Sequence, residues 1–261
     1  MGRKSELLAF AEDLARRAGE ITLRHFGKPI DVHRKSDLSP VTIADRQSEE
    51  FLCAEIERRF PGHGILGEEF GAVRPEAEWQ WIIDPIDGTQ SFIRGVPLYG
   101  VLIALEERGE SRLGVIHHPA LRETASAEVG RGAFLNGEPI RVADAANRDE
   151  TLILLTNPAT LFQRRPAFYI ELMKEYPLQR TWGDCYGYTL VASGRAQAMM
   201  DPIMNRWDLA ALKPIVEEAR GLFTDLHGTP TASGEHCLAA TPRVHAEILG
   251  LLRAHPPEQK G

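Results

Sequence analysis

Trp81-Ile82-Ile83-Asp84-Pro85-Ile86-Asp87-Gly88-Thr89 is the stretch around which the chain is organised. Its apolar first half predicts a mostly buried β-strand. We expect this strand to stop at Asp84, because Pro85 has no amide to donate to a β-ladder. Residues 89–93 then predict a short helix. A strand end that brings carboxylates beside the free amides of a helix start can hold cations and a phosphate together. The same residues are typical of an Asp-Gly turn in which Asp87 caps the helix, so the stretch alone leaves both interpretations open.

The composition is that of a globular protein with a large core. The chain has 261 residues, of which 43% are hydrophobic, and this suits one large domain or two closely packed halves. The polar stretch 144–150 looks like the join between two halves. We expect residues 1–145 to form an α+β half with the acidic motifs, and residues 146–261 to form an α/β half.

The charge balance narrows the range of partners. The net charge of −7 and the lack of a Lys or Arg run argue against a nucleic acid or an anionic membrane as partner. The longest apolar run, residues 96–105, is too short to span a bilayer. If the substrate is a phosphate, an acidic protein must supply positive charge locally, and bound metal ions are the obvious source.

The cysteines favour a cytoplasmic location. Cys53, Cys185 and Cys237 are odd in number and widely spaced, with no CxxC pair, which is typical of reduced thiols in a cytoplasmic protein. Glu6 and Glu12 interrupt any apolar segment of a signal peptide.

Hydrophobic periodicity predicts two amphipathic helices, residues 5–26 and 42–60, laid on an antiparallel sheet in the first half. The strands expected in this sheet are 65–66, 79–84, 98–105, 112–117 and 124–129, followed by a hairpin turn at Asn136-Gly137. In the second half strands and helices alternate. The expected strands are 152–155, 196–200, 222–226 and 237–240, and the expected helices are 166–176, 186–193, 207–220 and 241–253. Pro214 predicts a kink or a break in the third of these helices.

Carboxylates lie at the ends of several predicted elements. They are Asp45, Glu68, Asp84, Asp87 and Asp208. One carboxylate at a helix start is usually a cap, and Thr42 with Asp45 is such a pattern at the start of the second helix. Five carboxylates at element ends, flanked by Gly, Pro and Trp, are less easily explained in this way. Mg²⁺ takes oxygen ligands, and two such cations roughly 4 Å apart can bind a phosphate ester between them.

Three motifs together carry a family resemblance. Gly67-Glu68-Glu69, the 84–89 stretch and Trp207-Asp208, in this order, resemble the inositol monophosphatase-like family of Mg²⁺-dependent, lithium-sensitive phosphatases. The resemblance extends from Lys35 to Gly221. It implies a layered αβαβα sandwich, usually a homodimer, that binds two or three Mg²⁺ per active site and a small phosphorylated substrate.

The resemblance also implies roles for individual residues. The implied metal ligands are Glu68, Asp84, the carbonyl of Ile86, Asp87 and Asp208. The implied phosphate-binding groups are the amides of Gly88 and Thr89, with Lys35 near the site; the alternative for Lys35 is a solvated loop lysine. The implied catalytic residues are Glu68 and the pair Asp45 and Thr89, which would orient an attacking water.

The second half resembles one branch of this family. Residues 91–95, 183–187 and 207–211 look like the histidinol-phosphatase branch, which implies hydrolysis of histidinol phosphate with Asp184, Asp201 and Arg180 facing the substrate. The alternatives are a helix cap for Asp184, a turn residue for Asp201 and a surface charge for Arg180.

Two positions depart from the branch pattern, and two other functions stay open. Gln90 stands where Lys or Thr is common, and Arg220 where a second Gly is common. The first alternative is the same chemistry on inositol monophosphate or another small sugar or nucleotide phosphate. The second is a non-catalytic, metal-responsive binding protein, against which the complete set of implied ligands argues.

Overall fold

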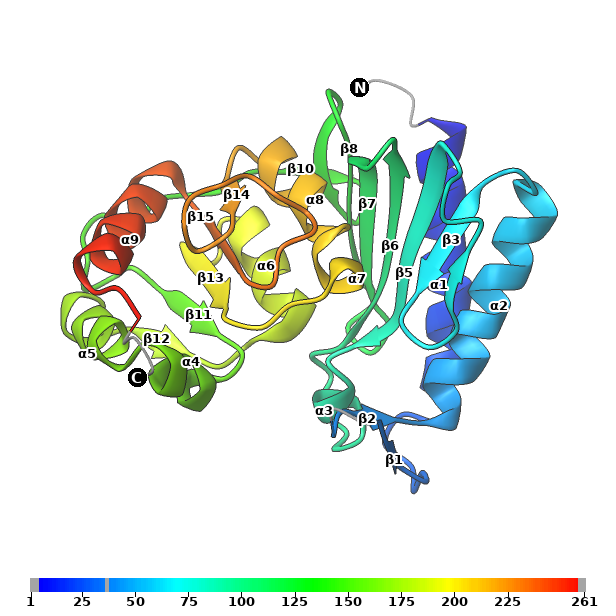
Figure 1. Ribbon diagram of the computed structural model, residues 1–261, viewed down its shortest axis with the longest axis horizontal. Coiled ribbons are helices and arrows are strands. Elements are labelled where there is room, and N and C mark those ends of the chain that lie inside the picture. Colours follow the sequence, from blue (N-terminus) through cyan, green and yellow to red (C-terminus); the bar gives the residue numbers. More distant parts are fainter. Residues whose placement is uncertain (1–4, 36–37, 258–261) are drawn as a thin grey trace.

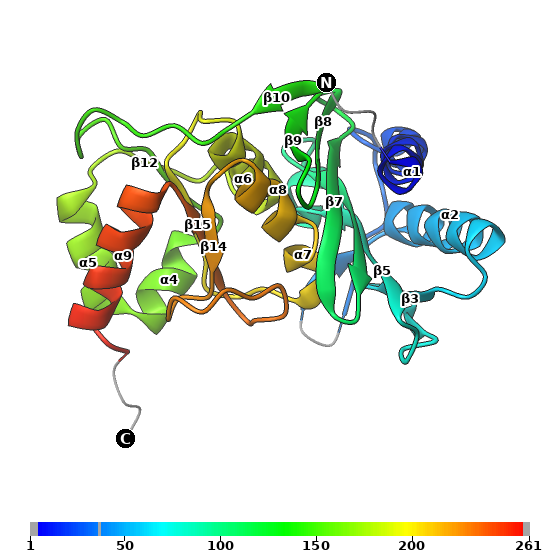
Figure 2. The same ribbon diagram turned by 90° about the horizontal axis from the view of Figure 1, so that it is seen from above.

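The computed structural model describes residues 5–35 and 38–257, and they form five layers. Helices α1 (Glu6–Leu23) and α2 (Ile43–Arg59) cover the outer face of an eight-stranded sheet, as Figure 1 and Figure 2 show. A middle layer of helices separates that sheet from a five-stranded sheet, and the remaining helices cover the far side (Figure 2). The middle helices are α6 (Asp184–Ala192), α7 (Arg206–Leu209) and α8 (Leu212–Glu218), and the far ones are α4 (Pro158–Arg164), α5 (Pro166–Glu175) and α9 (Pro242–Ala254).

The eight-stranded sheet contains the central stretch. Its strands are β3 (Gly64–Gly67), β4 (Gly71–Val73), β5 (Trp79–Asp87), β6 (Gly100–Glu107), β7 (Glu110–His118), β8 (Glu123–Glu128), β9 (Gly132–Leu135) and β10 (Glu138–Ile140). Their order is β10-β9-β8-β7-β6-β5-β3-β4, and all neighbours are antiparallel except β3 and β5. Asn136 and Gly137 have φ angles of 51° and 85°, the left-handed values that a tight hairpin turn requires, so the predicted hairpin is confirmed.

The expectation that the central strand stops at Asp84 is wrong. β5 continues through Pro85 to Asp87, and its pairing with β6 shifts register between Asp84 and Asp87. A bulge leaves a residue outside the ladder, so the missing amide of Pro85 is tolerated there. The bulge turns the end of β5, and the short helix α3 (Thr89–Phe92) follows as predicted.

The five-stranded sheet belongs to the second half. Its strands are β11 (Ile153–Leu155), β12 (Gln179–Arg180), β13 (Ala198–Asp201), β14 (Leu222–Thr224) and β15 (Cys237–Ala240), in the order β12-β11-β13-β15-β14. The sequence analysis missed α4 and β12, which are both short. It also missed the small hairpin β1 (His33–Arg34) and β2 (Pro40–Val41). The predicted break occurs at Ala210-Ala211, and Pro214 lies in the first turn of α8, where a missing amide is harmless.

Apolar cores hold the layers together. The side chains of Trp81 and Ile83 pack toward α1 and α2, whereas Ile82 packs toward α6 and α8. Both faces of β5 are therefore buried, which explains its nearly continuous apolar sequence. In the part of the chain that the structure describes, no helix is both long enough and apolar enough to cross a bilayer. The predicted αβαβα sandwich is confirmed.

Candidate metal centre and active site

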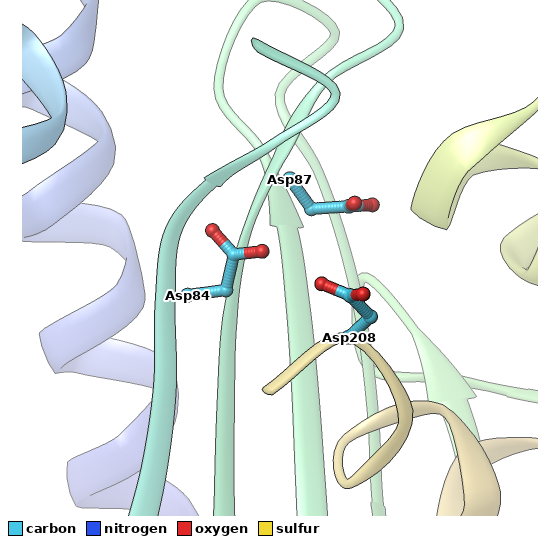
Figure 3. Close-up of side chains that lie close together, drawn as sticks. All are labelled: Asp84, Asp87 and Asp208. Carbon is cyan, nitrogen blue, oxygen red and sulfur yellow. The ribbon is translucent and has the colours of Figure 1, made fainter. Parts of the chain in front are cut away.

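Three of the predicted metal ligands meet between the eight-stranded sheet and the middle helices. One carboxylate oxygen from each of Asp84, Asp87 and Asp208 lies within 4.8 Å of the other two. Figure 3 shows the three side chains pointing toward a common space, two from the end of β5 and one from α7. The β5 bulge lets both aspartates of one strand face this space.

Local hydrogen bonds orient these carboxylates. Asp84 Oδ1 accepts the amide of Ile86 at 2.9 Å, and Asp208 Oδ2 accepts the amide of Asn205 at 2.7 Å. Asp87 Oδ2 accepts the amide of Cys185 at 2.5 Å and so caps α6, a helix of the other half. The cap considered for Asp87 at the start of α3 is therefore wrong, because this side chain caps α6 through Cys185, which lies 98 residues away in the sequence.

The electrostatics of this cluster favour a cation. Burial and the charges of Glu68, Asp87 and Asp208 raise the pKa of Asp84 well above its ordinary value. Burial, with Asp184 and Asp208, does the same to the pKa of Asp87, and burial raises the pKa of Asp208 to about 7. Buried carboxylates that repel one another are stabilised in their charged form when a divalent cation lies between them. Their all-oxygen donor set suits Mg²⁺.

Glu68 lies close to this cluster but is bound to a lysine. Lys35 Nζ lies 2.8 Å from Glu68 Oε1 and 2.5 Å from Glu69 Oε1. The charge of Glu68 nevertheless raises the pKa of both Asp84 and Asp208. Lys35 is therefore an ion-paired residue at the edge of the cluster, and the solvated-loop alternative does not describe it.

Asp45 uses one carboxylate oxygen for the helix cap considered for it, and its other oxygen takes no part in that cap. Its Oδ2 accepts the amide of Thr42 at 2.8 Å and the hydroxyl at 2.6 Å, which is the capping box at the start of α2. Its Oδ1 is buried and has no hydrogen-bond partner among the described residues. Burial raises the pKa of Asp45 to about 6. A buried carboxylate oxygen without a partner is costly, so this atom is ready to accept a hydrogen bond from a water or a ligand.

The turn after β5 needs its glycine. Gly88 has a φ of 84°, and a Cβ there would lie 3.0 Å from Asp184 Oδ2 and 3.1 Å from the Leu98 carbonyl. The Thr89 hydroxyl donates to the carbonyl of Ile86 at 3.0 Å. Two of the predicted site groups therefore contact each other directly, while the first amides of α3 have no acceptor within their own helix.

Asp184 and Asp201 line the same cavity as two of the metal-cluster carboxylates. This cavity of about 120 Å³ is lined by Asp87, Thr156, Asp184, Cys185, Tyr188, Asp201, Ile203, Met204, Asp208 and Leu212. Asp201 accepts the Tyr188 hydroxyl at 2.8 Å, and Asp184 lies 3.5 Å from the Ser91 hydroxyl. Burial and the charge of Asp201 raise the pKa of Asp184 to about 7. Arg180 is exposed on β12 and donates to the carbonyl of Gln179, and it does not line this cavity.

Comparison with known proteins identifies the family. Residues 3–256 match the inositol monophosphatase family. The chain belongs to this family. It is 47% identical to a histidinol-phosphatase of Chlorobaculum parvum, a match that covers 94% of this chain and 96% of that protein. It is 36% identical to an inositol-1-monophosphatase of Mesorhizobium japonicum, with 86% of this chain and 87% of that protein covered. Among solved structures, the IMPase of Thermotoga maritima matches with a TM-score of 0.88 and 32% identity, covering 96% of this chain and 98% of that one.

The sequence analysis missed supporting residues of this inositol monophosphatase-family site. Glu49 is fully buried and accepts the amides of Glu69 and Phe70 at 2.9 and 2.8 Å, so it holds the turn beside Glu68. The sequence pattern that could have identified Glu49 is its position one helical turn after Asp45, on the same face of α2. The Thr156 hydroxyl accepts the amide of Asp184 at 2.9 Å, and no local pattern marks that contact.

Proposed function

We propose that this protein is a Mg²⁺-dependent phosphomonoesterase that hydrolyses L-histidinol phosphate to L-histidinol and phosphate, a step of histidine biosynthesis. The observation that carries the proposal is the placement of Asp184 and Asp201 in one cavity with Asp87 and Asp208. The name of the Chlorobaculum parvum relative, at 47% identity, supports the same choice of substrate.

The metal ligands of this proposal are Glu68, Asp84, the carbonyl of Ile86, Asp87 and Asp208, which would hold two or three Mg²⁺. Bound Mg²⁺ would neutralise the phosphate charge, lower the pKa of a water and stabilise the leaving oxygen. The raised pKa values of Asp84 and Asp87 support this set, because nearby carboxylates of one sign account for part of each shift. We also propose inhibition by lithium, on the family resemblance.

The residues of the chain have their own tasks in the reaction. The partnerless Oδ1 of Asp45 would accept a hydrogen bond from the attacking water and orient it, with Thr89 nearby. The amides of Gly88 and Thr89 would bind the phosphate oxygens. Glu68 would act beside the water, and Lys35 would move from its ion pair with Glu68 toward the phosphate.

The negative charge of the cavity would determine which phosphate ester binds best. Histidinol phosphate carries an ammonium and an imidazole away from its phosphate, whereas inositol monophosphate carries hydroxyls there. A cation in a partly dry cavity needs carboxylates, and each charge-assisted hydrogen bond is worth about 1.5–3 kcal/mol. Asp184 and Asp201 would supply these carboxylates. Arg180 lies at the surface, and its role in substrate binding stays a prediction. The second candidate is inositol monophosphate, which the Mesorhizobium japonicum relative favours by its name.

The remaining parts of the proposal concern the whole protein. We propose a homodimer on the family resemblance, and a cytoplasmic location because Cys53, Cys185 and Cys237 are free thiols. We keep residues 1–145 and 146–261 as the two halves, since each contributes one sheet to the sandwich.

A phosphate-release screen tests the function. Purified protein with Mg²⁺ is assayed on histidinol phosphate, inositol monophosphates, nucleoside monophosphates and p-nitrophenyl phosphate, with the Asp84→Asn variant as control for contaminating phosphatase. We expect the highest kcat/KM on histidinol phosphate. A preference for inositol monophosphate would select the second candidate, and no Mg²⁺-dependent release above the control would leave only the binding protein.

A further inference from the structure

Helix α7, which carries Asp208, is attached to the eight-stranded sheet at both of its ends. At its start, Arg206 forms an ion pair with Glu106 of β6. Just after its last residue, the carbonyl of Ala210 accepts the hydroxyl of Ser111, on β7, at 3.2 Å. Both contacts join residues about a hundred positions apart in the chain. Figure 1 shows α7 beside the eight-stranded sheet.

The two anchoring residues are neighbours on the sheet. Glu106 and Ser111 face each other in the β6–β7 ladder, immediately after a shift of register between Leu105 and Glu106. Glu106 is 1% exposed and Ser111 is 9% exposed, so both side chains are largely shielded from solvent. The same sheet carries Asp84 and Asp87 on β5, the strand next to β6.

A helix this short depends on such contacts. α7 has only four residues, and a single turn fixes several backbone dihedrals for very few hydrogen bonds, so it does not persist alone. Asp208 is tied to its own turn by the amide of Asn205. The place of this carboxylate relative to Asp84 and Asp87 is therefore set by what holds the turn to the sheet.

We infer that Glu106 and Ser111 are positioning residues, a clamp on α7 that fixes Asp208 against Asp84 and Asp87 and thereby sets the affinity for the divalent metal. Neither residue lines the cavity described above or belongs to the carboxylate cluster. The inference rests on the proposed function insofar as the cluster binds a metal. Glu106 is buried in this pair, its side chain being 2% exposed, whereas the Arg206 side chain is 37% exposed. Removing the Glu106 charge therefore breaks a half-buried pair, which is more disruptive than breaking a fully exposed one.

The chain offers a matched control. Glu107 is the next residue on β6 and also pairs with an arginine, Arg112, at 2.8 Å, but its side chain is 27% exposed and this pair does not reach α7. Glu107→Gln therefore removes one charge and one ion pair from the same strand without loosening the clamp.

The test measures metal affinity directly as well as activity. Mn²⁺ binding is followed by the electron paramagnetic resonance of free Mn²⁺, and the Mg²⁺ concentration for half-maximal activity is measured in parallel. We expect Glu106→Gln to weaken Mn²⁺ binding about tenfold or more, and Ser111→Ala to weaken it severalfold, in folded protein well below its Tm. Glu107→Gln should stay within about twofold of wild type. Arg206→Gln added to Glu106→Gln should weaken binding no further, because both remove the same contact.

The outcomes separate this inference from the proposed function. A wild-type protein that binds no Mn²⁺ and hydrolyses no phosphate ester would refute the proposed function. A wild type that binds Mn²⁺, beside Glu106→Gln and Ser111→Ala variants with unchanged affinity, would overturn the clamp alone. Variants that lose thermal stability but keep wild-type Mn²⁺ affinity would also overturn it, since the two residues would then be structural only.

Discussion

Without metal, the active-site carboxylates should make the native state less stable as the pH rises. Burial raises the pKa of Asp208 from its ordinary value of 3.8 to about 7, so the native state holds this proton after the unfolded chain has lost it. The contribution of Asp208 to the free energy of unfolding is fully present below the pKa that this group has in the unfolded chain. It is lost as the pH rises to the pKa that the group has in the native state. We therefore expect Asp208→Asn, in chelator, to gain stability relative to wild type as the pH rises.

The size of the effect follows from the pKa of Asp208. Between about pH 5 and about pH 7 the wild type loses about 1.4 kcal/mol per pH unit through this group, on the order of 3 kcal/mol in all. The pKa of Asp208 is about 7, and at pH values above it the difference levels off. Burial lowers the pKa of His117 and His118 to about 4, and these groups act in the opposite direction below about pH 6.5. The comparison with Asp208→Asn cancels their contribution.

Urea unfolding of both proteins in chelator, at several values from about pH 5 to about pH 8, measures this difference. Asp225→Asn is the matched control, because hydrogen bonds from the amides of Thr229 and His227 lower the pKa of Asp225 and leave no proton to lose in this range. Added Mg²⁺ should reverse the order and make wild type the more stable protein, because metal binds the native state. A difference between wild type and Asp208→Asn that does not change with pH would refute the reasoning.

Three further predictions concern catalysis. Asp84→Asn should abolish Mg²⁺-dependent hydrolysis in a folded protein, which steady-state kinetics and circular dichroism check together; near-normal turnover would remove Asp84 from the ligand set. Asp45→Asn keeps the cap on α2 but weakens the acceptor for water, so kcat should fall roughly 10²-fold with little change in KM, and an unchanged kcat would leave Asp45 as a cap only. Asp184→Asn and Asp201→Asn should each lower kcat/KM for histidinol phosphate about tenfold or more while p-nitrophenyl phosphate hydrolysis stays nearly level, and equal losses on both substrates would make them structural.

The sequence predicted those parts of the fold whose cause is local. The apolar periodicity of α1 and α2 and the Asn136-Gly137 turn depend on neighbouring residues, and each appears where it was expected. The end of β5 was placed wrongly because the rule applied to Pro85 assumes a regular ladder. The bulge that admits Pro85 depends on the partner strand β6, which the local sequence does not specify.

In the candidate site, too, local sequence predicted some residues, whereas contacts between distant parts of the chain were not predicted. The motifs located Asp84, Asp87 and Asp208, because a strand end and a helix start can be recognised within a few residues. The cap that Asp87 provides for α6 and the ion pair between Glu106 and Arg206 could not be predicted, since each joins residues about a hundred positions apart. Asp184 was found by resemblance to a branch, and its φ of 49° was not foreseen. Asp is one of the few non-glycine residues that adopt this conformation readily.

Asp87 belongs to the carboxylate cluster and also lines the neighbouring cavity. One carboxylate lies in the cluster with Asp84 and Asp208 and also accepts the Cys185 amide at 2.5 Å, next to Asp184. Buried carboxylates without a cation are unfavourable, and the apolar cores on both sides of the sheet must offset that energy when the metal is absent. A cation that shares the charge of Asp87 would relieve the repulsion that Asp184 and Asp208 exert on it. Because Asp87 also fixes the start of α6, metal binding and the placement of Asp184 would then be coupled through a single side chain.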